Sequence, residues 1–296
     1  MPSLQRTDFV IIAVILAIGS LLLFPNLGDR DLWQDEAETA LLAGTVLEYG
    51  IPKAWDGHHR ITDQSDSRQY NDDDVWTWSG WLQFYVCAAA QSVLKPSPFR
   101  ERILFAIAGL LTLPLLYIIA WRFTRDRFFA AVCVGILMGS VFYLLLMRQC
   151  RHYSFDALLT LCMVLFYHQY ARGRRGIVGF TIAAILMFHA FFVTFFANMI
   201  AITVLFILYQ RRPDRRRQFF ISLAVIASCT LPFFIYSEGW SRDYSGLGNG
   251  FDSPWRFLSL LKTYLLLIVH YLFPLVVLAA AEIAAATRAP RYPFRR

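Results

Sequence analysis

Two short segments of this chain combine residue types that could act on a phosphate ester at a membrane surface. Asp35 and Glu36 stand in WQDEAE, soon after the first long apolar run. Arg148 and Arg151 stand in MRQCRHYSFD, at the junction of two later apolar runs. A carboxylate can serve as the general base for a hydroxyl group, and arginine binds phosphate through bidentate hydrogen bonds. Together the two segments could take a proton from an acceptor and hold the phosphate of a lipid.

Sugar transfer from a polyprenyl phosphate needs these two parts. The lipid phosphate leaves already ionised, so the reaction needs a base and an anion clamp, but neither a general acid nor a cofactor. Trp33, Asp156 and His189 are polar or aromatic residues near the ends of predicted helices, and they are further candidates for contact with a substrate.

Each motif also has an explanation that involves no chemistry. Asp35, with Glu38 three residues later, fits the capping pattern of a helix that begins there. Arg148 and Arg151 are three residues apart and would share one helical face, from which they could snorkel to the interface or pair with Asp156. A histidine near a helix end can likewise be buried and bound by a backbone carbonyl. The residues alone leave these alternatives open.

The composition excludes an ordinary soluble domain. Only 17% of the 296 residues are charged and the mean hydropathy is +0.46, which predicts an all-α, polytopic integral membrane protein. The first run, 9–27, is long enough for a retained membrane anchor. Lys and Arg stand in short clusters between apolar runs rather than on one stripe, which excludes a nucleic-acid partner. The five cysteines have no metal-binding spacing.

The apolar runs predict about eight membrane spans in a single domain that covers residues 1–296. The runs after the anchor are 75–94, 103–121, 128–147, 154–171, 176–210, 218–236 and 257–285. Four arginine clusters follow the later runs: Arg122, Arg125 and Arg127; Arg172, Arg174 and Arg175; Arg211, Arg212 and Arg215 to Arg217; and Arg288, Arg291, Arg295 and Arg296. If these clusters and Arg6 near the N-terminus all face the cytoplasm, each interval between them must hold an even number of crossings, and the interval from Arg6 to Arg122 holds three runs.

The number of crossings in each interval is even only if two of the runs do not form one membrane span each. Run 176–210 is too long for one span and is predicted to form two short helices that meet near His189 and Ala190. Run 75–94 is rich in Trp and Tyr and is predicted to lie in the interface, with an ordinary span as the alternative. Residues 28–101 then form one large extracytoplasmic loop.

Two clusters in this loop have side chains of the kinds that bind metal ions. The aspartates 72–74 offer oxygen ligands for a hard cation, and His58, His59 and Asp63 could suit zinc. A solvated loop is the simpler explanation of both clusters, so the sequence leaves a divalent cation open.

An ordered series of segments resembles a known family. WQDEAETALLAGTVLEYGIP, WTWSGWLQFY, RILFAIAGLLTLPLLYIIAWR and RQCRHYS are similar to the GT-C membrane glycosyltransferases, in the branch of the protein O-mannosyltransferases and the lipid A aminoarabinose transferases. The resemblance extends from residue 8 to residue 240. It implies a GT-C-like transmembrane module with interfacial helices in the first outer loop. It also implies Asp35 as the base beside Glu36, and donor phosphate binding by Arg148, Arg151 and Tyr153.

The resulting expectation is an inverting transferase that moves a sugar from a polyprenyl-phosphate donor to a hydroxyl or amine acceptor. Its partners would be the lipid-linked sugar, membrane lipids and an acceptor glycan, lipid or protein. Its expected location is a bacterial inner (plasma) membrane, with the active site facing the periplasm or the cell exterior. Relatives usually continue with further spans and an outer domain, so the C-terminal region here is short or missing. A non-catalytic binding or carrier protein, or a truncated inactive relative, is therefore the alternative.

Overall fold

The described part of the chain is all-helical. The structure is a computed structural model that describes residues 4–61, 69–173, 175–210, 212–238 and six positions between 255 and 266. The chain divides into two compact units, Met1–Gly239 and Trp240–Arg296, and nearly all described residues belong to the first. They form ten α-helices and, outside these, three isolated β-bridges in the first loop. The predicted all-α fold class is therefore confirmed.

Several predictions of the sequence analysis fall outside the described residues. They concern Asp63, Arg174, Arg211, almost all of the run 257–285 and the arginine cluster at the end of the chain. The ten helices, in chain order, are α1 (Arg6–Leu23), α2 (Gln34–Tyr49), α3 (Leu82–Gln91), α4 (Pro98–Thr124), α5 (Arg127–Met138), α6 (Val141–Met147), α7 (Tyr153–Ala171), α8 (Ile177–Ala190), α9 (Phe192–Tyr209) and α10 (Pro213–Tyr236).

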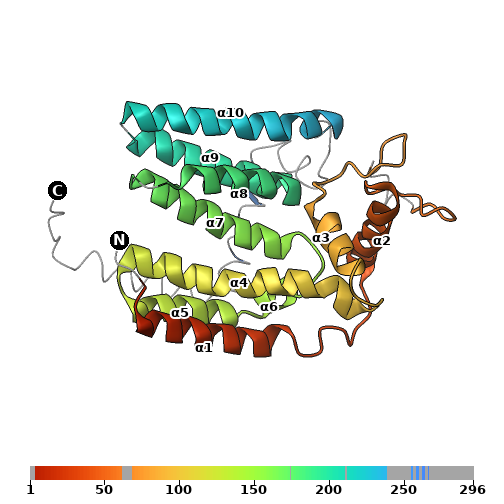
Figure 1. Cartoon of the computed structure of the whole chain (residues 1–296), viewed down its shortest axis with the longest axis horizontal. Helices are drawn as coiled ribbons and strands as arrows, with labels where there is room; N and C mark the ends of the chain where they lie inside the picture. Colours follow the sequence, from red (N-terminus) through yellow and green to blue (C-terminus); the bar gives the residue numbers. More distant parts are fainter. Residues whose placement is uncertain are drawn as a thin grey trace. The chain divides into compact units, whose positions relative to one another are not determined.

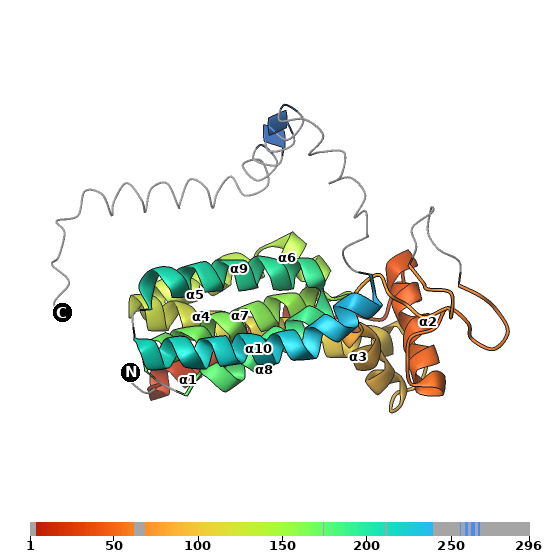
Figure 2. The same ribbon diagram turned by 90° about the horizontal axis from the view of Figure 1, so that it is seen from above.

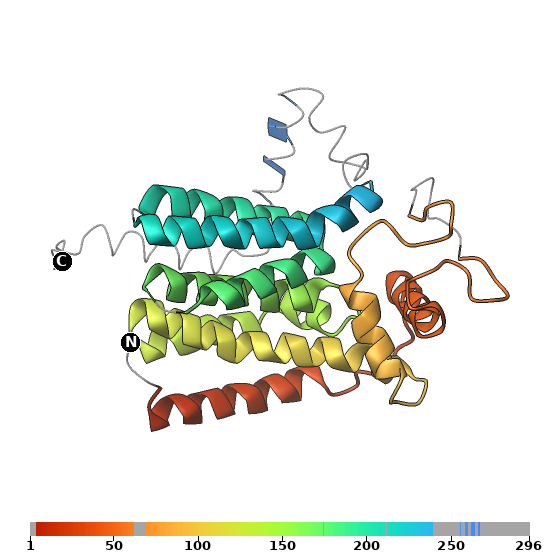
Figure 3. The ribbon, with the colours of Figure 1, turned by 45° about the horizontal axis from the view of Figure 1, so that its top comes forward.

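The longer helices of the first unit run side by side as a bundle, as Figures 1, 2 and 3 show. α4 packs against α1, α5 and α7, and α8 packs against α7, α9 and α10. The first loop contributes α2 and α3, which lie together at one end of the bundle (Figure 1). We call this the loop end. The opposite end, where α4 and α7 end and α10 begins, carries Arg122, Arg172 and Arg212, and we call it the basic end.

Four of these helices are long and apolar enough to cross a membrane: α1, α4, α9 and α10. α5 and α6 together would make a fifth span, although they are bent by 71° at their junction. α8 is apolar but has only 14 residues. The chain is thus an integral membrane protein, and the described residues contain fewer full-length spans than the runs predicted.

The prediction that run 176–210 forms two helices is confirmed. α8 ends at Ala190, Phe191 is extended with φ −158° and ψ 122°, and α9 begins at Phe192. Run 128–147 was predicted as one helix, and this is wrong. The chain breaks at Gly139 and Ser140, where the Ser140 hydroxyl accepts a hydrogen bond from the Tyr143 amide (3.3 Å) and so begins α6.

The predicted interfacial helix 75–94 is only partly correct. The helix begins at Leu82, because the preceding residues belong to the irregular first loop. Trp76 is 2% exposed, forms a β-bridge with Tyr70 and donates a hydrogen bond from its indole to Ser79 (3.1 Å). Its burial stabilises an extended segment where the aromatic content suggested a helix at the membrane interface.

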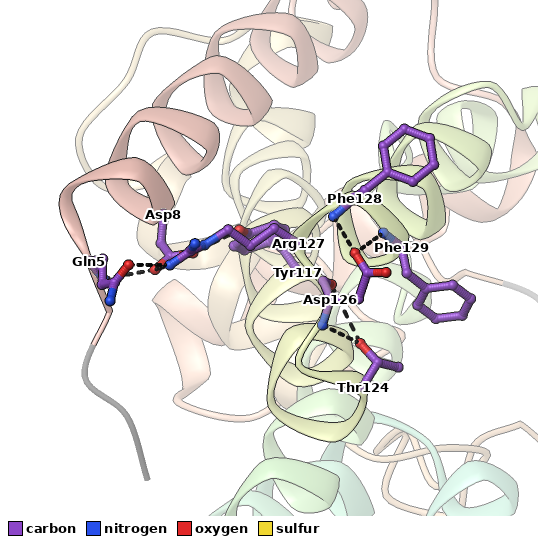
Figure 4. A network of polar contacts seen from close by, with 8 residues as sticks. All are labelled: Gln5, Asp8, Tyr117, Thr124, Asp126, Arg127, Phe128 and Phe129. Carbon is purple, nitrogen blue, oxygen red and sulfur yellow. Dashed lines mark hydrogen bonds and ion pairs between the residues drawn. The ribbon is translucent and has the colours of Figure 1, made fainter.

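A polar network joins three helices at the basic end. Asp8 of α1 is fully buried, forms an ion pair with Arg127 of α5 (2.7 Å) and accepts a hydrogen bond from the Tyr117 hydroxyl of α4 (3.0 Å). Arg127 also donates to the side chain of Gln5 (2.6 Å). Figure 4 shows these contacts. Because the buried carboxylate has both a charged partner and a neutral donor, the start of α1 is fixed against α4 and α5.

Candidate active site

Asp35 lies in the first turn of α2, at the loop end of the bundle. The N-cap of this helix is Trp33, whose side chain makes no capping hydrogen bond, and Asp35 lies two residues after it, inside the helix. The alternative that Asp35 is a capping residue is therefore wrong. Trp33 is 45% exposed, and Gly50 ends the helix in a left-handed conformation (φ 78°) that glycine adopts without strain.

The structure brings Asp35 together with Arg151. The Arg151 side chain comes from the turn between α6 and α7, and its Nη2 lies 3.3 Å from Asp35 Oδ2. Its Nη1 donates to the Asp35 carbonyl (3.3 Å) and lies 3.8 Å from Glu38 Oε2. Arg151 Nε is buried and has no hydrogen-bond partner among the described residues. The guanidinium thus faces two carboxylates and keeps one donor for a ligand.

Glu36, in contrast, is completely engaged by the protein. It is 1% exposed, and its two oxygens accept hydrogen bonds from Arg102 Nε (2.9 Å) and Nη2 (2.6 Å). Arg102 also donates to the carbonyls of Leu27 (3.0 Å), Arg30 (2.8 Å) and Asp31 (2.9 Å). This bidentate pair joins the start of α4 to the segment between α1 and α2.

Glu36 also fixes the turn that carries Arg151. Glu36 Oε1 accepts a hydrogen bond from the Cys150 amide (3.0 Å), and Cys150 is fully buried. The position of Arg151 relative to Asp35 therefore depends on Glu36 and Arg102. The sequence analysis missed Arg102. Its position could have pointed to it, because Arg102 lies at the end of a predicted span that is opposite the arginine clusters, as Arg148 and Arg151 do.

The expectation that Arg148 and Arg151 share a helical face is wrong. α6 ends at Met147, and Arg148 is the C-cap of that helix. The Arg148 guanidinium donates from Nη2 to the Pro25 carbonyl (2.7 Å), just after α1. The two arginines therefore contact different segments: Arg148 contacts the turn just after α1, and Arg151 contacts the acidic segment at the start of α2.

Asp156 and His152 form a separate polar group one helical turn into α7. Asp156 Oδ2 accepts a hydrogen bond from the Thr194 hydroxyl of α9 (3.2 Å) and lies 3.7 Å from His152 Nε2. Asp156 Oδ1 is buried without a partner among the described residues. The His152 ring stacks on Phe191 (4.2 Å between centroids) and lies 4.4 Å from the ring of Tyr153. Burial and the charge of Arg151 lower the pKa of His152 to about 3.

His189 lies at the end of α8 and is surrounded by aromatic side chains. Its ring is 5.2 Å from Phe188 and 5.5 Å from Phe233 of α10. Its carbonyl lies against Gly80 of the first loop, where an added Cβ would be 2.2 Å from the oxygen. These contacts favour a packing role for His189, which holds the first loop against α8.

The candidate metal ligands are not gathered at one point in the part of the chain that the structure describes. No group of three or more His, Cys, Asp or Glu there could hold a metal ion. Asp74 forms an ion pair with Arg60, and Asp56 accepts hydrogen bonds from the amides of His58 (2.8 Å) and His59 (2.6 Å).

Comparison with known proteins finds a solved structure with a similar fold. No family model and no curated protein matches the chain. Among solved structures, it is similar to ArnT from Cupriavidus metallidurans bound to undecaprenyl phosphate, with a TM-score of 0.58 and 16% sequence identity. The match covers 97% of this chain and 52% of ArnT, so the chain spans about half the length of that protein. This similarity of fold to ArnT agrees with the family resemblance that the sequence motifs indicated.

Proposed function

We propose that this chain is a glycosyltransferase that moves a sugar from a polyprenyl-phosphate donor to a hydroxyl or amine acceptor. The observation that carries the proposal is the contact of 3.3 Å between Asp35 and Arg151. This contact places a candidate base beside an arginine that could bind phosphate, at the loop end of the bundle. The structure of ArnT, which has a similar fold, is bound to undecaprenyl phosphate. Bidentate binding by arginine is suited to such a phosphate.

The ion pair suggests how donor binding could activate the base. While Arg151 contacts Asp35, the guanidinium occupies the carboxylate oxygen Oδ2, which an acceptor hydroxyl or amine would otherwise approach. A donor phosphate would compete for the same guanidinium, whose Nε is still without a partner among the described residues. Binding of the donor would therefore draw Arg151 away from Asp35 and leave the carboxylate free to accept a proton.

The proposed reaction is a single inverting displacement. The acceptor oxygen or nitrogen attacks the anomeric carbon as its proton passes to Asp35. The bond between the anomeric carbon and the phosphate oxygen breaks, and the polyprenyl phosphate leaves as an anion beside Arg151, with Arg148 as a second cation nearby in the chain. Electrostatic stabilisation of this anion is the main contribution to the rate. Because no step needs a metal ion, turnover should be unchanged after treatment with EDTA.

Other residues of the site have supporting roles. Glu36 is a positioning residue, because both of its oxygens are bound by Arg102 and the Cys150 amide. Tyr153 is assigned to the donor site because it begins α7, two residues after Arg151. Exposed Trp33 is placed to contact lipid headgroups or substrate, and Asp156 keeps one carboxylate oxygen for a sugar hydroxyl.

We place the site outside the cytoplasm, in a bacterial plasma membrane. The support is the distribution of arginines: the described members of the basic clusters lie at the basic end, opposite α2 and α3. Loops rich in Lys and Arg stay in the cytoplasm, so the loop end faces the periplasm or the exterior.

The decisive experiment is turnover by the purified protein with a polyprenyl phosphate that carries a labelled sugar. Asp35→Asn should reduce release of the polyprenyl phosphate by about 100-fold or more, the usual contribution of a general base. Asp29→Asn, a matched change in the same loop, should leave the rate unchanged. Equal rates for Asp35→Asn and the unmodified protein would refute the mechanism. A protein that binds the donor but never cleaves the ester would instead be a carrier.

A further inference from the structure

A buried histidine at the basic end has two ring nitrogens that no described residue contacts by a hydrogen bond. His168 lies in the last turn of α7 and is 9% exposed. Neither Nδ1 nor Nε2 has a hydrogen-bond partner among the described residues. An unsatisfied buried polar group costs about 1–3 kcal/mol, so a ligand that hydrogen-bonds to this ring would stabilise the folded chain.

The surroundings of His168 are strongly basic. Arg172 follows one turn later, where its amide donates to the His168 carbonyl (3.2 Å). Arg122 and Arg125 stand at the end of α4, which packs along α7, and all three arginines are close enough to act on the ring electrostatically. The turn between α4 and α5 contains one acidic residue, Asp126. Its carboxylate caps the start of α5 by accepting a hydrogen bond from a backbone amide of that helix. The ligand that these charges favour is an anion.

The site is also apolar on one side. The His168 ring lies 4.4 Å from the ring of Phe123, and the Phe123 side chain is 55% exposed at the end of a membrane-spanning helix. A ligand that combines a negative headgroup with an acyl chain could therefore contact the arginines and this aromatic surface at once. A small inorganic anion would use the charges alone.

We propose that the ends of α4 and α7 form a binding site for the phosphate of an anionic membrane lipid, with His168, Arg172 and Arg125 as its ligands and Phe123 beside the acyl chain. This lipid is distinct from the polyprenyl phosphate of the proposed reaction, since the site lies at the basic end and the candidate active site at the loop end (Figure 1). A basic pocket between helix ends is a recurrent form of lipid headgroup recognition.

The test uses the full chain purified in an uncharged detergent. The thermal unfolding midpoint is measured while one of three compounds is titrated: phosphatidylglycerol, phosphatidylcholine or inorganic phosphate. A shift of the midpoint reports binding. Phosphatidylglycerol should raise the midpoint, and the other two should not. His168→Phe and Arg172→Gln should each weaken the apparent affinity for phosphatidylglycerol by about tenfold, the loss expected for one hydrogen bond to a charged group. Arg216→Gln is the control, because it removes one exposed charge of another cluster.

The outcomes separate a specific site from general attraction. An equal loss in Arg216→Gln and Arg172→Gln would overturn the proposal in favour of diffuse charge. An equal shift with inorganic phosphate would overturn the assignment to a lipid. Arg172 is exposed, so its variant tests the site even if His168→Phe does not fold.

Discussion

Asp35 and Glu36 are neighbours in the chain, but their carboxylates have different surroundings. Glu36 is buried against Arg102 and the Cys150 amide, whereas the Asp35 side chain is 26% exposed and contacts Arg151. The sequence pointed to both carboxylates. It could not assign their roles, because adjacent helical residues point about 100° apart and packing decides which of them faces the core. The partner Arg102 is 66 residues away from Glu36, beyond any local pattern.

The ion pair between Glu36 and Arg102 should contribute to stability as a unit. Glu36→Leu leaves a buried guanidinium without its counter-charge, and Arg102→Leu leaves a buried carboxylate. Each single change should lower the free energy of unfolding by about 3–5 kcal/mol, and the double change by clearly less than the sum. Denaturant unfolding in detergent measures all three. Additive losses would show that the two residues act independently.

His152 should make the protein less stable in acid. Its pKa is about 3 in the folded chain because the ring is buried beside Arg151, against 6.5 for an unperturbed histidine. Below pH 6.5 the unfolded chain takes up a proton that the folded chain does not, so stability falls as the pH decreases toward 3. His152→Phe keeps an aromatic ring against Phe191 and should remove on the order of 2–3 kcal/mol of the loss between pH 7 and pH 4.5.

Comparing the unfolding midpoints of both proteins at these two pH values isolates His152 together with its neighbour Asp156, which lies 3.7 Å from His152 Nε2, because the other titrating groups are shared. The same decrease in both proteins would rule out a neutral, buried His152.

At the level of elements, the sequence predicted which segments are helical better than it predicted where helices break. The division of run 176–210 followed from an argument about the whole chain, the even number of crossings between arginine clusters. The break at Gly139 and Ser140 and the late start of α3 at Leu82 depend on local contacts. A Ser140 cap and the burial of Trp76 cannot be read from hydropathy, because apolar runs look the same whether they are straight, bent or extended.

The first loop depends on a close approach between two backbones. Gly80→Ala would place a Cβ 2.2 Å from the His189 carbonyl oxygen, so α8 or the loop must shift. Gly135→Ala is the matched control, since a Cβ there meets nothing within 4 Å. We expect Gly80→Ala to lower the thermal unfolding midpoint, and Gly135→Ala to leave it unchanged or raise it, because alanine favours a helix by about 1 kcal/mol over glycine. Equal midpoints for the two variants would contradict the contact.

At the scale of the whole molecule, charge and hydropathy predicted the arrangement well. The described arginines of the clusters lie at one end of the bundle and the first loop lies at the other, as the parity argument required. The number of spans was less predictable, because α8 is short and α5 and α6 are bent. Helix length in a membrane bundle is set by packing as well as by apolar length.

The two ends of the bundle should be reachable from opposite sides of the membrane. In a protein whose exposed Cys229 and partly exposed Cys133 and Cys162 are replaced by Ser, a cysteine introduced at position 29 or at position 216 tests this with a membrane-impermeant thiol reagent. We expect the cysteine at position 29 to react in intact cells and the cysteine at position 216 only after the membrane is opened. Labelling of both in intact cells would contradict the orientation.

The measurement that tests the proposed site most directly is the affinity of purified Asp35→Asn and Arg151→Gln for polyprenyl phosphate without a sugar. If Arg151 exchanges Asp35 for the donor phosphate, Arg151→Gln should bind the lipid about tenfold more weakly or worse. Asp35→Asn should bind it as tightly as the unmodified protein or more tightly, while its turnover is lost. Weaker lipid binding by Asp35→Asn, or unchanged binding by Arg151→Gln, would contradict a site in which a base and a phosphate compete for one guanidinium.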